Sequence, residues 1–248
     1  MVELFPEDYV NGIMSTISLI IPMIITILIF VRYFRFKNKQ IIYIGISTFG
    51  INWSYSGTVA AFFWLFFTKT SLPEPIYFIL PICVYPITLG CWIYLVLDLA
   101  KVKKAKLLGL MTFIIVLILD ITYIYLAFTQ TSLLGEIVEG RNIDVKFYGY
   151  AALYSLISLG IVWLGLIIFL RDVFKSVSKE LKVRGTLLLV ALIIFSLAVS
   201  FDSWVDLNIP QLIGVRTFVI ISAIISYLGW FLPEPIKRRL MKEKNTKE

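Results

Sequence analysis

Ionisable side chains inside long apolar stretches are the best candidates for chemistry in this chain. Asp120 lies in the run Ile-Leu-Asp-Ile-Thr, eight residues before Phe128. At 1.5 Å of rise per helical residue, its carboxyl group lies ~12 Å from the end of that stretch. A carboxylate in a spanning helix is costly and faces the protein interior. Three interpretations stay open: a protonated acid bonded to a neighbouring helix, a contact to a ligand or cation, and a carrier of protons or ions.

A second group joins two acids to a cation across a short link. Asp202 and Asp206 lie near the end of one apolar stretch, and Arg216 follows at the start of the next. Because the link is short, an ion pair between Arg216 and either acid is geometrically easy. The pair is either a salt bridge that clamps two helices or part of an outer vestibule for a charged or zwitterionic ligand.

Polar and aromatic residues at similar depths extend these groups. Tyr123 follows Asp120 by three positions, so the two share one helix face. Asn52 and Tyr55 lie near the middle of the second apolar stretch. Amides inside spans often bond across helices, so Asn52 is interpreted either as a packing contact or as part of a site.

Two prolines should bend the third apolar stretch. Pro81 and Pro86 each remove a helical hydrogen bond, and Tyr85 lies between them. The bend either shapes the bundle or opens a site. We predict an outward-opening polar cavity whose members share similar depths and inward-facing polar groups: Asn52, Tyr55, Tyr85, Asp120, Tyr123, Asp202 and Arg216.

The composition shows what must hold these side chains in place. The chain of 248 residues is 59% hydrophobic and 16% charged, whereas a soluble domain is about half apolar and a quarter charged. A spanning helix needs about 20 mainly apolar residues, and backbone groups in lipid must be paired within the helix. The sequence therefore predicts one all-α domain of seven transmembrane helices over about 10–32, 41–67, 76–98, 107–128, 147–170, 186–206 and 212–232.

The distribution of positive charge predicts the orientation of these helices. Nineteen of the 23 Lys and Arg residues fall in the first, third and fifth links and in the basic tail, 233–248. The other side carries only Lys69, Arg141, Lys146 and Arg216. Cytoplasmic loops hold the excess of Lys and Arg, so we expect the N-terminus outside and the C-terminus in the cytoplasm.

Two segments outside the spans carry further expectations. The longest outer link, about 129–146, is expected to be a solvated cap or turn, or else a lid over an outer cavity. The tail is expected to form a short amphipathic helix on the inner leaflet or a simple stop-transfer segment, with partner docking as a further option.

Several chemistries are excluded by residues that the chain lacks. It has no histidine, which removes a Ser-His protease, a zinc hydrolase with His ligands and a His-ligated haem. Cys83 and Cys91 would lie ~12 Å apart in one helix, too far for a disulfide. The topology is similar to that of rhodopsin-type and other seven-helix receptors, but 212–232 contains no lysine for a retinal Schiff base. We therefore expect no cofactor, no metal and no enzymatic activity.

These observations favour a receptor- or sensor-like protein of the cell membrane. Its partners would be the lipid bilayer, a small molecule or lipid bound from the outer half, and a separate cytoplasmic or membrane protein that reads a helix shift. The first alternative is a small-solute or proton-coupled transporter that uses Asp120, and the second is a structural or assembly subunit. The net charge of +7 comes from membrane-flanking loops, so we do not expect a nucleic-acid partner.

Overall fold

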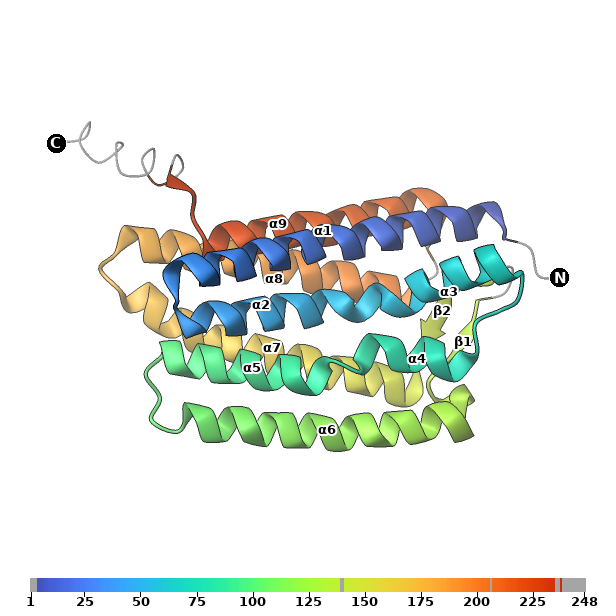
Figure 1. Ribbon diagram of the computed structural model, residues 1–248, viewed down its shortest axis with the longest axis horizontal. Helices are drawn as coiled ribbons and strands as arrows, with labels where there is room; N and C mark the ends of the chain where they lie inside the picture. The colour runs from blue at the N-terminus through green and yellow to red at the C-terminus, as the bar shows by residue number, and fades with distance from the viewer. Residues whose placement is uncertain (1–3, 139–140, 206, 235–236, 238–248) are drawn as a thin grey trace.

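Helices make up almost all of the computed structural model, which describes residues 4–138, 141–205, 207–234 and 237 (Figure 1). The first part of the chain forms α1 (Pro6–Phe36), α2 (Lys39–Asn52), the 3-10 turn η1 (Trp53–Tyr55), α3 (Ser56–Thr68), α4 (Glu74–Ile82) and α5 (Tyr85–Leu99). The second part forms α6 (Ala105–Thr129), η2 (Thr131–Leu133), β1 (Gly135–Ile137), β2 (Val145–Phe147), α7 (Gly149–Lys175), α8 (Lys179–Trp204) and α9 (Ile209–Trp230).

Local sequence signals explain where several helices begin and end. At the start of α9, the Asn208 side chain accepts the Gln211 N–H at 3.0 Å, and the Gln211 side chain accepts the Asn208 N–H at 3.0 Å. This reciprocal capping box satisfies two backbone donors, and Pro210 suits the first helical turn. Helix α1 ends at Lys37, whose φ of 53° is a left-handed conformation that stops the helix.

Multi-pass membrane architecture is confirmed, but the count of seven spans is not. Among the described residues, six helical segments are long and apolar enough to cross a membrane: α1, α4 with α5, α6, α7, α8 and α9. The expected span 41–67 is instead divided by η1 into α2 and α3. The segment has no proline, and side chains that bond locally to the backbone favour the break: Ser54 Oγ donates to the Ile51 carbonyl at 2.9 Å.

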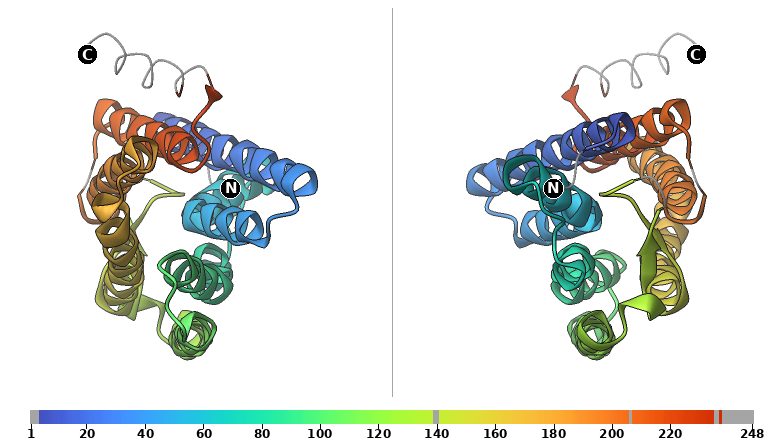
Figure 2. Two further views of the ribbon diagram at one scale, coloured as in Figure 1. Left: turned by 90° about the vertical axis from the view of Figure 1, so that its left-hand side faces the viewer. Right: turned by 90° about the vertical axis from the view of Figure 1, so that its right-hand side faces the viewer.

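Seen from the end, the helices form two walls (Figure 2). One wall contains α2 with α3 and α4 with α5, and the other contains α7 and α8. Helices α1 and α9 pack side by side along one edge, and α6 packs against α5 at the opposite edge. The largest hydrophobic core cluster takes its residues from α3 to α8 and from the hairpin, with Leu65, Val96, Val116 and Leu166 among its fully buried members.

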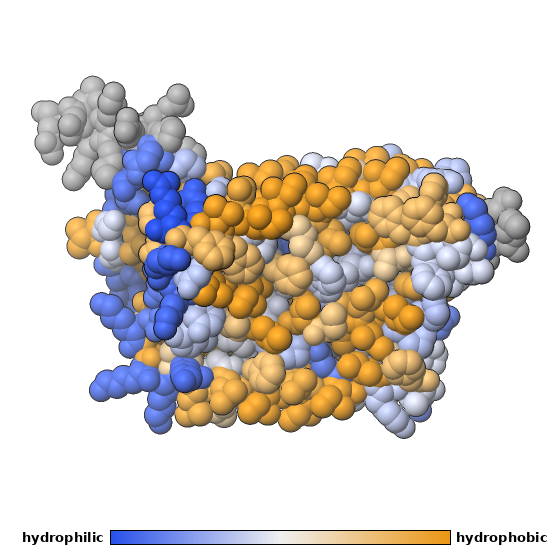
Figure 3. Space-filling model, in the orientation of Figure 1, coloured by the Kyte–Doolittle hydropathy of each residue, from blue (hydrophilic) through white to orange (hydrophobic). Residues whose placement is uncertain are grey.

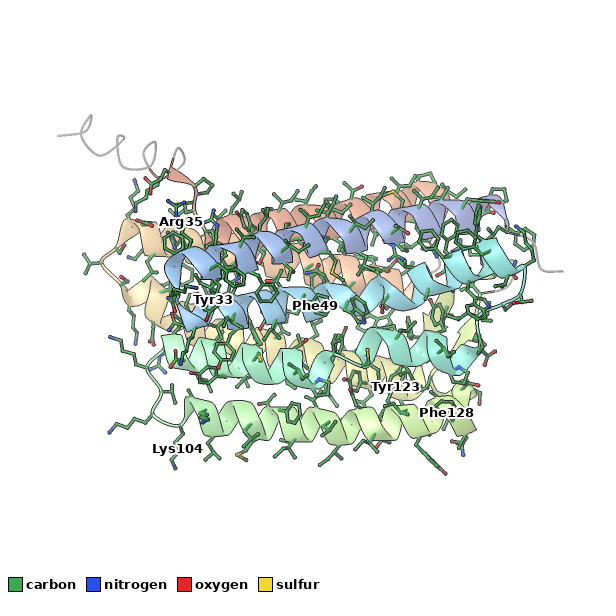
Figure 4. All side chains as sticks on the ribbon, viewed as in Figure 1. Tyr33, Arg35, Phe49, Lys104, Tyr123 and Phe128 are labelled. Carbon is green, nitrogen blue, oxygen red and sulfur yellow. The ribbon has the colours of Figure 1, made fainter. Side chains whose placement is uncertain are left out.

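On the face shown in Figure 3, apolar side chains cover the middle of the bundle, and the polar surfaces at its two ends are unequal. Exposed apolar side chains of the bundle include Ile27, Leu110, Ile118, Leu164 and Leu197. Strongly hydrophilic side chains gather at the end where α1, α5 and α7 finish. Arg35 and Lys104 lie at this same end (Figure 4). The exposed apolar side chains form the surface that lipid would cover, because exposed apolar area on this scale is unfavourable in water.

Polar contacts tie the helix ends together at the basic end. Arg32 donates to the Tyr227 hydroxyl at 3.1 Å, joining α1 to α9. Glu180 pairs with Arg184 at 2.6 Å within α8 and with Lys237 at 3.0 Å, close after α9. Most of the basic tail, 233–248, including the predicted amphipathic helix, lies outside the described residues.

Candidate functional site

A cavity of about 140 Å³ lies between the two walls, toward the end opposite the basic loops. Its lining comes from α2, η1, α3, α4, α5, α6, α7, α8, α9 and the β2 strand. It includes five of the seven residues that the sequence predicted: Tyr55, Tyr85, Tyr123, Asp202 and Arg216. Tyr123 lies on the side of α6 that faces α4 and α5 (Figure 4). The structure therefore brings these five residues together, while their role in binding stays a prediction.

Arg216 lies on one side of this cavity and contacts residues of three other elements. It is 3% exposed, and its Nη2 lies 3.2 Å from Asp202 Oδ1 and 3.1 Å from Asn11 Oδ1. Its guanidinium carbon lies 4.1 Å from the centroid of the Tyr55 ring, a cation–π contact. One cation thus joins α9 to α8, α1 and η1. Asp206, the other acid considered from the sequence, lies outside the described residues.

Asp120 lies behind the cavity wall. It is 3% exposed and does not line the cavity, but it accepts a hydrogen bond from the Tyr154 hydroxyl. Tyr154, on α7, lines the cavity itself. The carboxyl group of Asp120 is therefore bonded to a neighbouring helix, as one of the open interpretations had it, while the protonated state in that interpretation stays a prediction. A ligand in the cavity would reach Asp120 only through Tyr154.

Tyrosine rings surround this carboxyl group and form the adjoining wall. The rings of Tyr85 and Tyr154 stack at 6.0 Å with an interplanar angle of 13°. Tyr123 meets Tyr154 edge to face at 5.4 Å. The Tyr85 hydroxyl shares a hydrogen bond of 2.9 Å with Ser54 Oγ. Such rings present apolar faces with polar tips, which suits a ligand that carries both kinds of surface.

Asn52 separates from the rest of the predicted group. Its Nδ2 donates to the Thr48 carbonyl at 2.8 Å within α2. It lines a second cavity, nearer the basic end, and does not line the first. The expectation of one site with seven members is therefore wrong for Asn52, because η1 turns Tyr55 and Asn52 toward different cavities.

The two interrupted segments of the bundle meet beside the first cavity. Helix α4 ends at Ile82 and α5 begins at Tyr85, so the bend expected from Pro81 and Pro86 is a break into two helices. The indole of Trp53, in η1, donates to the Leu80 carbonyl at 2.8 Å. The Leu80 carbonyl, near the break between α4 and α5, thus accepts a hydrogen bond from Trp53 in the break between α2 and α3. Irregular backbone at membrane depth needs such partners, and it occurs where it lines a cavity.

A β-hairpin caps the cavity, with strands β1 and β2 antiparallel in the register Glu136 to Lys146. The expectation of a solvated link over 129–146 is wrong for its core, since Leu134, Ile143 and Val145 are buried. The hairpin does cover a cavity, because Val145 and Phe147 line it, while the alternative of a lid on the outer side stays a prediction. A short isolated hairpin is at best marginally stable, so its burial requires contacts that only the folded bundle supplies.

Polar contacts to three elements hold the hairpin in place. Oδ1 of Asp8, in the first turn of α1, accepts the backbone N–H of Asn142 at 2.9 Å and of Ile143 at 3.4 Å. Arg141 Nη2 donates to the Leu207 carbonyl at 2.6 Å, and the Tyr77 hydroxyl donates to the Ile143 carbonyl at 3.4 Å. Asp8, Tyr77 and Tyr154 were not among the residues that the sequence predicted. Asp8 was not considered because it lies outside the expected spans. Tyr77 and Tyr154 were not considered because a tyrosine inside a span does not by itself indicate a functional site.

The charged groups of the site are already paired, which limits its chemistry. Arg216 pairs with Asp202, and Arg141 pairs with Asp144 at 2.5 Å. No group of three or more His, Cys, Asp or Glu side chains that could hold a metal ion occurs in the described part of the chain. The lining is rich in tyrosine and serine hydroxyls, which can both donate and accept hydrogen bonds. This arrangement suits reversible binding of a small polar molecule.

Comparison of the chain with protein-family models and with curated protein sequences finds no match.

Proposed function

We propose that this protein is a receptor- or sensor-like integral protein of the cell membrane that binds a small molecule or lipid from its outer half. The observation that carries the proposal is the capped cavity of about 140 Å³, which is lined by hydroxyl groups and by a buried ion pair. Most ligand sites are concave and largely apolar, with a few convergent polar groups. This cavity has that composition.

Seven spans with an outside N-terminus and a cytoplasmic C-terminus are part of this proposal. Successive links alternate between the two ends of the bundle when α2, η1 and α3 are taken as one crossing segment (Figure 1). The links that carry most of the Lys and Arg residues then share one end. Because positive charge marks the cytoplasmic side, the capped cavity would open toward the outside.

Helices α8 and α9 offer a path from the cavity to the cytoplasmic end. Near one end they carry Asp202 and Arg216, and near the other Arg184 donates to the Trp230 carbonyl at 3.2 Å. A ligand that changes the distance between the first two residues would shift both helices relative to each other. Such a shift is favoured only by the difference in the ligand's affinity for the two states. A separate protein would read the change in the basic loops.

Ligand-dependent thermal stability of the purified protein in nanodiscs tests this proposal. The probes are panels of neutral polyols, zwitterionic amino acids and single-chain lipids. The Ser158→Phe variant fills the cavity, since Ser158 lines it on α7. Leu156→Phe is the matched control, because Leu156 lies on the lipid-facing surface of the same helix. We expect a saturable increase in melting temperature that Ser158→Phe removes and Leu156→Phe retains. The proposal is rejected if no probe in the three panels stabilises the wild-type protein.

A small-solute or proton-coupled carrier is the second candidate, and the paired helix breaks favour it. Carriers bind substrate near the bilayer midplane between interrupted helices. Here the breaks after Asn52 and after Ile82 lie side by side, linked by the Trp53 indole and the Leu80 carbonyl. Uptake into liposomes that is lost in Asp120→Asn would favour proton coupling. Saturable stabilisation without uptake would favour the receptor.

A further inference from the structure

A second cavity, of about 80 Å³, lies directly behind the first on the side of the basic loops. Helices α2, α5, α7, α8 and α9 line it. Along α7 the outer lining runs from Tyr154 to Val162, and the inner lining continues from Val162 to Leu166. Along α8 the inner lining runs from Leu188 to Phe195, and the outer lining continues from Phe195. The two cavities are therefore stacked along the bundle.

Three apolar side chains separate the cavities. Ile51, Val162 and Phe195 line both of them, and they come from α2, α7 and α8. We call these three residues the neck. An apolar constriction between two cavities that each contain polar groups closes a pathway by excluding water, and a small displacement of one side chain opens it. Phe195 has the largest of the three side chains, so its rotamer has the greatest effect on the width of the neck.

Polar atoms without protein partners line the inner cavity. Within the described part of the chain, Ser47 Oγ and Asn52 Oδ1 are buried and make no hydrogen bond to protein. Buried polar atoms are normally satisfied, by protein or by enclosed water. A buried water needs at least about 10–15 Å³ of such space and two or more polar partners, so this cavity has room for several waters or one small polyol. The unsatisfied oxygens thus point to a polar occupant.

The lining of the inner cavity restricts the charge of that occupant. Every residue that the structure places on its wall is uncharged. An ion in this cavity would lose its hydration without gaining a countercharge, whereas a neutral hydroxyl compound would lose far less. At the cytoplasmic end, Trp230 closes the space, with its ring 6.4 Å from Trp92 and 5.9 Å from Phe169. The Trp230 carbonyl is held by Arg184.

We propose that the two cavities form one route for a small, uncharged, hydroxyl-bearing solute, with Phe195 as the gate between them. The route rests on the proposed function in one respect, since the solute first occupies the outer cavity. It goes further by assigning an inner site, lined by Ser47 and Asn52, and by naming the chemical class of the solute. Trp230 and its aromatic neighbours close the inner end of this route.

Glycerol flux into proteoliposomes tests the route, measured by stopped-flow light scattering with protein-free vesicles as the baseline. We expect wild-type protein to raise glycerol entry above baseline and glycine entry to stay at baseline. Phe195→Ala should increase glycerol entry several-fold by widening the neck, and Val162→Phe should return it to baseline. Leu197→Ala is the matched control, since Leu197 lies on the lipid-facing surface of α8, and it should behave like wild type.

Folding of each variant is checked by its melting temperature, and Phe195→Leu provides a smaller change should Phe195→Ala fail to fold. Glycerol entry at baseline for wild type and both Phe195 variants overturns the route. That result leaves the proposed function intact if a probe still stabilises the protein in a manner sensitive to Ser158→Phe. Conversely, flux that depends on Phe195 without stabilisation by any probe supports the route and rejects the receptor.

Discussion

Arg216 and Asp202 meet 3.2 Å apart, at the point where α8 ends and α9 begins, and both are largely buried. The pair lines the outer cavity and also fixes the angle between two long helices. Removing one partner from a buried ion pair leaves an uncompensated charge, while replacing both by apolar side chains is far less costly. The pair can therefore contribute both to ligand binding and to helix packing. Single and double mutations distinguish these two contributions.

Single replacement of Arg216 should destabilise the protein more than replacement of the pair. We expect Arg216→Met to lower the free energy of unfolding by about 3–5 kcal/mol, because Asp202 stays buried without its partner. The double variant Arg216→Met, Asp202→Leu should recover part of that loss. Denaturant unfolding in detergent measures both. Strict additivity of the two single changes would contradict the pairing.

Loss of the Tyr154 hydroxyl should weaken the contact between α6 and α7. Tyr154→Phe removes the donor to the buried Asp120, so we expect a loss of about 1–3 kcal/mol in unfolding free energy. Asp120→Asn keeps a carbonyl acceptor and should cost less. Tyr125→Phe is the control, since that hydroxyl is on the exposed face of α6. Equal stability of Tyr154→Phe and the control would show that the bond contributes nothing.

Replacement of Asp8 should release the hairpin cap. Asp8→Ala removes the carboxylate that accepts the N–H groups of Asn142 and Ile143. We expect faster amide hydrogen exchange across 141–147, because opening of the hairpin no longer breaks these bonds. Exchange in the distant 100–104 loop should not change. The neighbouring change Glu7→Ala keeps the Asp8 contacts and should leave the hairpin protected; acceleration by both variants alike would implicate helix fraying instead.

Orientation in the membrane is tested by cysteine labelling of intact cells. In a background with Cys83 and Cys91 replaced, Glu136→Cys should react with an impermeant thiol reagent applied outside, because Glu136 is exposed on the hairpin. Lys103→Cys, in the link between α5 and α6, should react only after the cells are broken. Labelling of Lys103→Cys from outside would reverse the proposed orientation.

The apolar stretches and the charge distribution were readable from the sequence because both are local properties. Approximate spans followed from length and hydropathy, and Pro81 with Pro86 predicted a bend at the place where the chain breaks before Tyr85. Depth along each stretch placed Tyr55, Tyr85, Tyr123, Asp202 and Arg216 at one level, where they do line one cavity. Asp120 was identified as buried for the same reason, since a charge in a span must face protein.

Tertiary structure decided which way each residue faces and what it meets. The break at η1 combines the local bond from Ser54 to the Ile51 carbonyl with the bond from Trp53 to the Leu80 carbonyl, and this second partner lies in another segment that no local pattern relates to Trp53. Asn52 lines the inner cavity, and Tyr154 of α7 donates its hydrogen bond to Asp120 of α6. The hairpin folds back because Asp8 offers acceptors 134 positions away. The sequence determines which groups must be buried, but only the packing of the helices determines their partners, because those contacts join residues that no local periodicity relates.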